Sequence, residues 1–292
     1  MEGYLSMLVN GLSYAMLLFL FTAGFTLQFG VLGVLNLAHG SFYMLGVFFS
    51  LTIAMFLGHL AGSFWIGLLI APLFVALIGA FMERTLLRRI YGRDVLVQYL
   101  FTYTWIYILD DLVRMIWGAR YSIVVMPDYF ASAINVMGVN LSPYRLFIVV
   151  FGLVMGFLLW YFLQKTKMGM FVRAASDNRD MVSSLGVNTP ALFTIVFAVG
   201  AWLAGIGGVL ASPLQTAYAG MGIAIIVDCF IVVVIGGMGS IKGAFIAALL
   251  IGFLRSFGIA FFPELEMALK YILMAAVIIL RPRGLFGKEE VH

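Results

Sequence analysis

The sequence contains little charge, one cysteine and few histidines. Asp, Glu, Lys and Arg together make up only 10% of its 292 residues. A single cysteine, Cys229, excludes an intramolecular disulfide and leaves the redox compartment undefined. The three histidines, His39, His59 and His292, are scattered, and no carboxylate or cysteine stands near His39 at ligand spacing. The chain therefore lacks the ionisable clusters that a metal site or an intramembrane enzyme would need.

A nucleotide-binding motif is also missing. The glycine-rich segment 236–243, GGMGSIKG, resembles a phosphate-binding loop only faintly. That loop needs the pattern G-x-x-x-x-G-K-[ST], whereas here Ile241 precedes Lys242 and Gly243 follows it. The chain is therefore not expected to bind ATP or any other cofactor. Its formal net charge of +4 is explained by charged loops at a membrane better than by binding of nucleic acid.

Hydrophobic residues dominate the composition. They make up 64% of the chain, and the mean hydropathy is +1.11. The apolar runs are continuous and long enough for membrane-spanning helices, whereas a transmembrane barrel shows short alternating segments. The expected fold class is an all-α integral membrane protein, a polytopic bundle of about eight or nine transmembrane helices with broken helices among them. Residues 1–292 should form a single transmembrane domain.

Charge in the loops predicts the orientation of the bundle. Windows of about twenty apolar residues predict spans near 6–31, 37–57, 64–87, 95–117, 144–164, 190–211, 224–239, 244–262 and 267–281. With the N-terminus outside, Arg114, Arg120 and Arg145 lie at the outer face, and the other Lys and Arg residues of the loops lie in the cytoplasm. This arrangement satisfies the positive-inside rule. We therefore expect an external N-terminus and a cytoplasmic C-terminus.

The longest stretch that could not lie inside a bilayer is Lys165–Asn188. Ser176 or Asp177 is suited to be the N-cap of a short helix, and Asp180 adds an acid to its first turn. Gly186 stands where a C-terminal capping glycine is expected. The stretch therefore predicts a short independent helix in the cytoplasm.

This helix carries an apolar strip formed by Ala174, Ala175, Met181, Val182 and Leu185. An apolar strip outside the lipid needs a partner. The helix could fold back onto its own protein or onto the bilayer surface, or it could dock on another subunit. From the residues alone both interpretations stay open.

The stretch Phe29–Gly46 joins the first two predicted spans. Four glycines permit a break or close helix contacts, and Asn36, His39 and Ser41 supply polar groups inside an apolar region. Broken helices with polar residues at the break often line transport pathways. The alternative is a tight cytoplasmic turn in which the Asn and His side chains merely cap helices.

Few charges lie within the predicted spans. Asp228 and Arg255 fall in the outer halves of neighbouring spans, and each alone would be costly, so we expect them to pair. Glu266 can reach Lys270 four residues on. No isolated acid stands near the middle of a span, which favours energy supplied by another subunit over proton-driven transport. A channel stays open as an alternative.

Three stretches together carry a family resemblance: GVLGVLNLAHGSFYMLG, RAASDNRDMVSSLGVN, and VVVIGGMGSIKGAFIAALLIG followed by RPRGLFG. They resemble the LivH-type permeases of branched-chain amino acid ABC importers, and the likeness covers nearly the whole chain. It implies a cytoplasmic coupling loop at 165–188, which inserts into a cleft of an ATPase subunit. The implied coupling residues are Arg173, Ala174, Ala175, Ser176, Asp177, Asp180, Met181, Leu185 and Gly186.

The resemblance also implies the partners. They are a second, LivM-type permease, two ABC ATPase subunits that hold ATP and Mg²⁺, and a periplasmic binding protein, assembled at the bacterial inner membrane. The chain itself would be a transport subunit without enzymatic activity. The residues that we expect along the substrate pathway are Asn36, His39, Ser41, Gly236, Gly237, Gly239 and Ser240. Relatives that carry urea, amides or small organic acids leave the substrate open, and a gated channel would transport without ATP.

Overall fold

The chain folds into a bundle of helices with one short hairpin. The computed structural model describes residues 2–58, 62–136 and 138–287, so His59 and His292 lie outside the described residues. The long helices are α1 (Glu2–Leu32), α2 (His39–Leu57), α3 (Ser63–Thr85), α4 (Val95–Trp117), α5 (Pro143–Lys165), α8 (Thr189–Ala211), α9 (Met221–Gly236), α10 (Ile241–Phe261) and α11 (Glu266–Leu280). Strands β1 (Ile134–Val136) and β2 (Val139–Leu141) pair antiparallel. The helical fold class is confirmed.

Each predicted span coincides with one of these helices, but they differ in length and charge. Within the described residues, six helices are long and apolar enough to cross a membrane, namely α1, α2, α3, α5, α8 and α10. Helix α9 has 16 residues and α11 has 15, and α4 carries Asp110, Asp111 and Arg114. A multi-pass helical membrane protein is thus confirmed, and the count of eight or nine spans stays a prediction.

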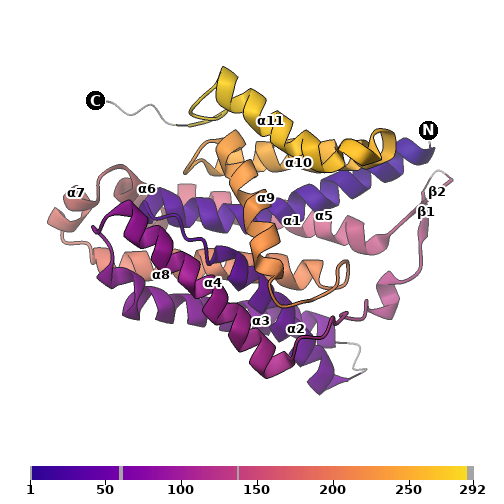
Figure 1. The fold of residues 1–292 in the computed structure, drawn as a ribbon, viewed down its shortest axis with the longest axis horizontal. Coiled ribbons are helices and arrows are strands. Elements are labelled where there is room, and N and C mark those ends of the chain that lie inside the picture. The colour runs from indigo at the N-terminus through magenta and orange to yellow at the C-terminus, as the bar shows by residue number, and fades with distance from the viewer. Residues whose placement is uncertain (1, 59–61, 137, 288–292) are drawn as a thin grey trace.

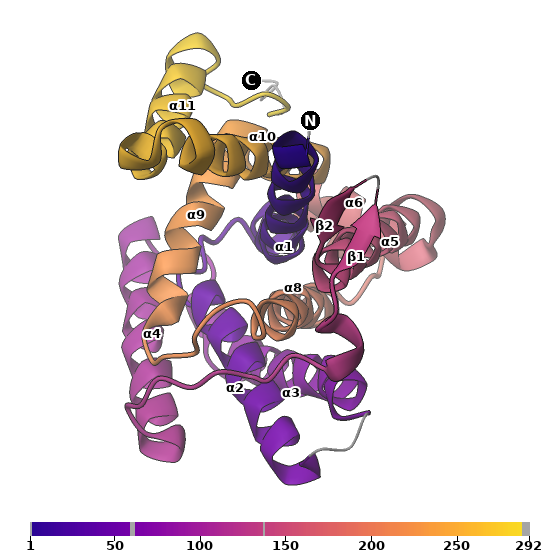
Figure 2. The same cartoon turned by 90° about the vertical axis from the view of Figure 1, so that its right-hand side faces the viewer.

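Helix α1 lies in the middle of the bundle. It packs along α10 and α8 and also contacts α5, as the view down its axis in Figure 2 shows. Glycines allow these backbones to approach closely: a Cβ at Gly24 would collide with the carbonyl oxygen of Gly200, and one at Gly252 with that of Gly11. Such small-residue contacts are the usual means by which helices pack tightly in lipid.

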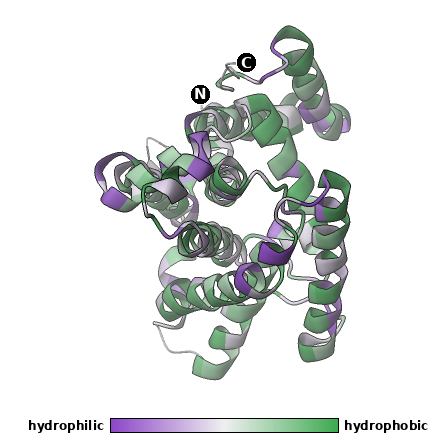
Figure 3. Cartoon of the chain, turned by 90° about the vertical axis from the view of Figure 1, so that its left-hand side faces the viewer, coloured by the Kyte–Doolittle hydropathy of each residue, from purple (hydrophilic) through white to green (hydrophobic). Residues whose placement is uncertain are grey.

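The two ends of the bundle differ. The start of α1 and the hairpin lie at one end, and helices α6 (Lys167–Asp177) and α7 (Arg179–Ser184) lie at the opposite end (Figure 1). Following the predicted orientation, we call these the outer and the inner end. Seen from the inner end, most residues of the helices are hydrophobic, and the hydrophilic residues gather in short segments (Figure 3). Such a surface suits contact with lipid.

Candidate functional site

The connection between α1 and α2 turns back inside the bundle. Helix α2 begins at His39, whose Nε2 lies 3.1 Å from the carbonyl oxygen of Phe21. About 16 Å of α1 still follows Phe21 before the helix ends at Leu32. Asn36 and Ala38 are buried in the connection. The structure therefore has a helix break at depth, as the glycine and polar residues suggested, and not a turn at the surface.

Polar side chains gather at this break. We call Gln28, Asn36, His39 and Ser41 the polar cluster; all four are buried. Gln28 donates to the carbonyl oxygen of Phe197 at 2.9 Å, and Asn36 donates to the Gln28 side chain at 3.4 Å. Asn36 Oδ1, His39 Nδ1 and Ser41 Oγ are buried without a hydrogen-bond partner. Each such atom costs about 1–3 kcal/mol, so its presence needs a reason other than stability.

The glycine-rich residues expected on the pathway lie at the inner end, and their place on it stays a prediction. Gly237 has a φ of +98°, which favours glycine, and its backbone touches Gly287. Gly236 accepts a hydrogen bond from the backbone N–H of Phe286. Gly239 lies against Gly30, and Ser240 Oγ caps α10. The contacts described for this turn join helix ends and include no member of the polar cluster.

A cavity at the outer end was not foreseen. We call it the outer cavity; its volume is about 570 Å³, within the range of small-molecule sites. Its walls come from α1, α2, α5, α8, α9 and α10 and from the segment between α8 and α9. The polar and charged residues that line it are Asn10, Ser13, Tyr14, Tyr43, Arg145, Gln215, Tyr218, Asp228, Arg255 and Ser256.

Two ion pairs border the outer cavity. Lys270 Nζ lies 2.5 Å from Asp228 Oδ1, and Arg255 Nε lies 3.3 Å from Glu266 Oε1. Tyr14 links the pairs, since its hydroxyl donates to Asp228 at 2.9 Å and its ring lies under the Arg255 guanidinium. The direct pair expected between Asp228 and Arg255 is not among the ion pairs of the described residues. Helix α11 supplies a nearer partner to each of them.

The inner end carries two short helices where one was expected. Asn178 separates α6 from α7 and caps α7, because its Oδ1 accepts from the Met181 N–H at 2.9 Å. Ser176 and Asp177 therefore end α6, and their expected role as N-cap is wrong. The reason is an earlier start: Thr166 caps α6 just after α5 ends. Gly186 has a φ of +81°, as expected after a helix.

The predicted apolar strip divides between two faces. Ala175 and Val182 are buried at 1% and 3% exposure, so the expectation that Ala175 is available to a partner is wrong. Met181 and Leu185 are 62% and 77% exposed. The residues that remain open are Met170, Ala174, Met181 and Leu185, which we call the apolar inner face. Helices α6 and α7 therefore pack against their own bundle with one side, and their other side is exposed.

The charged residues of this loop have different surroundings. Asp180 is exposed on α7, and its backbone carbonyl accepts a bond from Ser184. Arg173 is half-buried, and its Nη1 has no hydrogen-bond partner. Its carbonyl oxygen accepts from the Ser176 hydroxyl at 2.8 Å.

Arg179 joins α7 to two other parts of the bundle. Its guanidinium lies 5.8 Å above the ring of Phe193 in α8. It also fills the space where a Cβ of Gly33 would stand, at the start of the α1–α2 connection. Arg179 therefore connects α7 to the segment that leads to the polar cluster.

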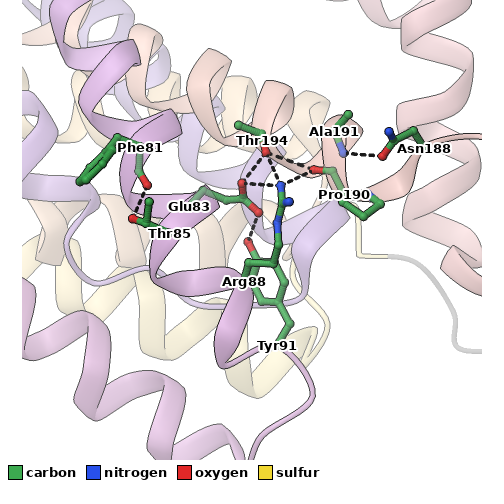
Figure 4. A network of polar contacts seen from close by, with 9 residues as sticks. All are labelled: Phe81, Glu83, Thr85, Arg88, Tyr91, Asn188, Pro190, Ala191 and Thr194. Atoms are coloured by element: carbon green, nitrogen blue, oxygen red, sulfur yellow. Dashed lines mark hydrogen bonds and ion pairs between the residues drawn. The ribbon is translucent and has the colours of Figure 1, made fainter.

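A buried carboxylate organises the inner end of α3 (Figure 4). Glu83 is fully buried and accepts from the hydroxyls of Thr194 at 2.5 Å and Tyr91 at 3.2 Å. Arg88 lies 3.4 Å from Glu83 and donates to Thr194 and to the Pro190 carbonyl. Burial and the nearby Glu83 carboxylate raise the pKa of Tyr91 well above its usual value. The network ties α3 to the start of α8, just after α7.

Known proteins resemble this chain along nearly its full length. Residues 7–280 match the family described as the permease component of branched-chain amino acid transport systems. The permease protein BraD of a high-affinity branched-chain amino acid transport system, from Pseudomonas aeruginosa, is 28% identical and aligns over 99% of this chain and 97% of its own. The corresponding LivH protein of Escherichia coli is 27% identical, with the same coverage. No solved structure matches.

Proposed function

Because this chain belongs to the family of permease components of branched-chain amino acid transport systems, we propose that it carries branched-chain or other hydrophobic amino acids through the inner membrane. It works as one subunit of an ATP-driven ABC importer. A second, homologous permease, two ATPase subunits and a periplasmic binding protein complete the assembly. The observation that carries this proposal is the family match over residues 7–280, which covers all of the predicted spans except the first and last span residues, 6 and 281.

Coupling to the ATPase is assigned to the apolar inner face. Met181 and Leu185 are the more exposed members of this face, on or just after a helix capped at Asn178. A helix as short as α7 is marginal alone, and its exposed apolar side chains gain most by burial in a cleft of another subunit. Arg179 then passes the movement of α7 to Phe193 and to the Gly33 segment.

The substrate pathway is assigned to the polar cluster. Asn36, His39 and Ser41 each keep a buried polar atom without a partner, at a break between helices. Unpaired polar groups are tolerated where they meet a passing ligand or its water. Helices α4, α9 and α11 are proposed as spans besides the six that satisfy both length and composition, which makes nine in all.

Reconstitution tests this function. The chain is placed in proteoliposomes together with a second permease, two ATPase subunits and a binding protein of the proposed system, and uptake of radiolabelled L-leucine is measured. Uptake should need both ATP and the binding protein, and unlabelled valine or isoleucine should compete. Equilibration without ATP would instead identify a channel. Competition by urea but by no amino acid would identify a different substrate.

A further inference from the structure

We propose that the outer cavity is itself a binding site for a zwitterionic apolar amino acid and that Arg145 holds its carboxylate. The inference rests on the proposed function, since it concerns the same cargo, but it locates a site on the permease. Recognition of the cargo would then not rest with the binding protein alone.

Arg145 is the reason for assigning a carboxylate. Its side chain lines the cavity near the start of α5 and is half-buried. Among the described residues it has neither a hydrogen bond nor an ion pair, whereas Asp228 and Arg255, the other charged residues of the lining, are each paired. The cavity therefore keeps one uncompensated positive charge. A guanidinium offers two parallel donors to a carboxylate, which makes it the most selective partner for that group.

Asp228 can receive the ammonium group. Its oxygens already accept from Tyr14 and Lys270, but a carboxylate offers about four lone-pair sites. Its side chain is 16% exposed and belongs to the cavity lining. Arg145 and Asp228 thus give the cavity one group for each charge of a zwitterion.

The rest of the wall suits an apolar side chain. Leu17, Leu18, Met221, Ile225 and Ile259 line the same cavity. A cavity of about 570 Å³ has ample room for one amino acid and some water. Sites for small molecules typically combine such an apolar wall with a few polar groups that fix orientation.

Two aromatic side chains separate the cavity from the polar cluster. Tyr43 lines the cavity, and a hydrogen bond from Gln215 holds its hydroxyl. The Tyr43 ring packs 5.5 Å from that of Phe21, and the Phe21 ring lies 4.9 Å from that of His39. The cavity is therefore placed as the outer chamber of the pathway, closed toward its centre by Tyr43 and Phe21.

The test measures binding of L-leucine and of leucinamide, which lacks the carboxylate. The complete complex is used without ATP or binding protein, in nanodiscs of zwitterionic lipid. Arg145→Gln should weaken leucine binding by about tenfold or more, because a charge-assisted bond is lost. It should not weaken leucinamide binding, and removal of the positive charge should strengthen binding of this cationic ligand. Arg145→Lys keeps the charge but loses the two parallel donors of the guanidinium, so its leucine affinity should lie between those of wild type and Arg145→Gln. Arg120 is an exposed outer arginine away from the cavity, and Arg120→Gln should bind leucine as wild type does.

Absence of saturable leucine binding to the wild-type complex would overturn the proposal. So would an equal loss of leucine and leucinamide binding in Arg145→Gln, which would assign this arginine a structural role or a lipid phosphate. ATP-driven leucine uptake by the wild-type complex is measured in parallel. If wild-type uptake is normal but Arg145→Gln does not weaken leucine binding selectively, the cavity site is wrong and the proposed function stands. Arg145-dependent binding without any uptake would overturn the proposed function alone.

Discussion

At the scale of single residues, the inner end depends on one buried carboxylate. Glu83 is fully buried and satisfied by three neighbours, two hydroxyls and a guanidinium. A buried pair adds little net stability, yet breaking it leaves a buried charge without compensation. Loss of Glu83 should therefore destabilise the protein by more than the small net stability that the intact network adds.

Glu83→Ala should destabilise the purified protein by about 3 kcal/mol, because Arg88, Thr194 and Tyr91 lose their common acceptor. Thermal unfolding in detergent would measure this as a clear fall in Tm. The matched control is Asp111→Ala, since the Asp111–Arg114 pair is long at 3.8 Å and exposed. That control should change stability by less than about 1 kcal/mol. Equal effects of the two variants would contradict a special role for Glu83.

In the polar cluster, a substitution should lower transport without lowering stability. Ser41→Ala removes a buried hydroxyl that has no partner, so it should leave Tm unchanged or raise it while it lowers leucine uptake. In the control, Ser212→Ala removes a buried hydroxyl that donates to the Val209 carbonyl at 2.8 Å and should lower Tm by losing about 1 kcal/mol. Full uptake by Ser41→Ala would remove Ser41 from the pathway.

At the scale of elements, α6 and α7 show how a surface helix serves two purposes. One side of the pair, with Ala175 and Val182, is buried against the protein. The other side, with Met181 and Leu185, is open. A substitution on these helices therefore acts on folding or on partner binding according to the side on which it lies.

Met181→Glu should leave the permease folded in the membrane but abolish substrate-stimulated ATP hydrolysis by the complex, because it places a charge in the surface that the ATPase would cover. Ala175→Glu lies six residues earlier, on the buried side. It should instead lower the amount of folded permease in the membrane. Membrane content and ATPase activity, measured on both variants, separate the two effects. If Met181→Glu keeps full stimulated hydrolysis, the apolar inner face is not the coupling surface.

At the scale of the whole molecule, the bundle has two distinct ends. The hairpin lies toward the start of α1, and α6 and α7 lie at the opposite end (Figure 1). The outer cavity is lined by Met7, Asn10 and Tyr14, near the start of α1. Lys and Arg gather in the loops assigned to the inner end, as the positive-inside rule requires. The predicted orientation in the membrane rests on this asymmetry and can be tested directly.

Cysteine labelling of intact cells is well suited to this chain, because Cys229 is its only cysteine and is fully buried. An impermeant thiol reagent should label Asn140→Cys, at an exposed hairpin position, from outside. It should label Ser183→Cys only after the cells are permeabilised. Labelling of Ser183→Cys in intact cells would reverse the predicted topology.

The sequence by itself determined the helices and the capping glycine, and it offered a helix break beside a surface turn, a choice that the structure decided. Each depends on local patterns: apolar runs for the spans, Gly33 and Asn36 at the break, and a glycine with positive φ at position 186. The Lys and Arg asymmetry needs only loop composition. The helix start at Asn178 was missed because several neighbouring residues can cap, and the cap that forms depends on where the preceding helix begins.

Only the tertiary structure decided which side chains meet. The membrane helices are hydrophobic all round, so periodicity does not say which side of a helix faces the bundle. Asp228 and Arg255 pair with Lys270 and Glu266 because α11 packs across α9 and α10. The burial of Ala175 and the position of Arg145 in the cavity wall depend on the rotation of their own helices. These contacts join residues far apart in the chain, and their geometry is set by packing rather than by local sequence.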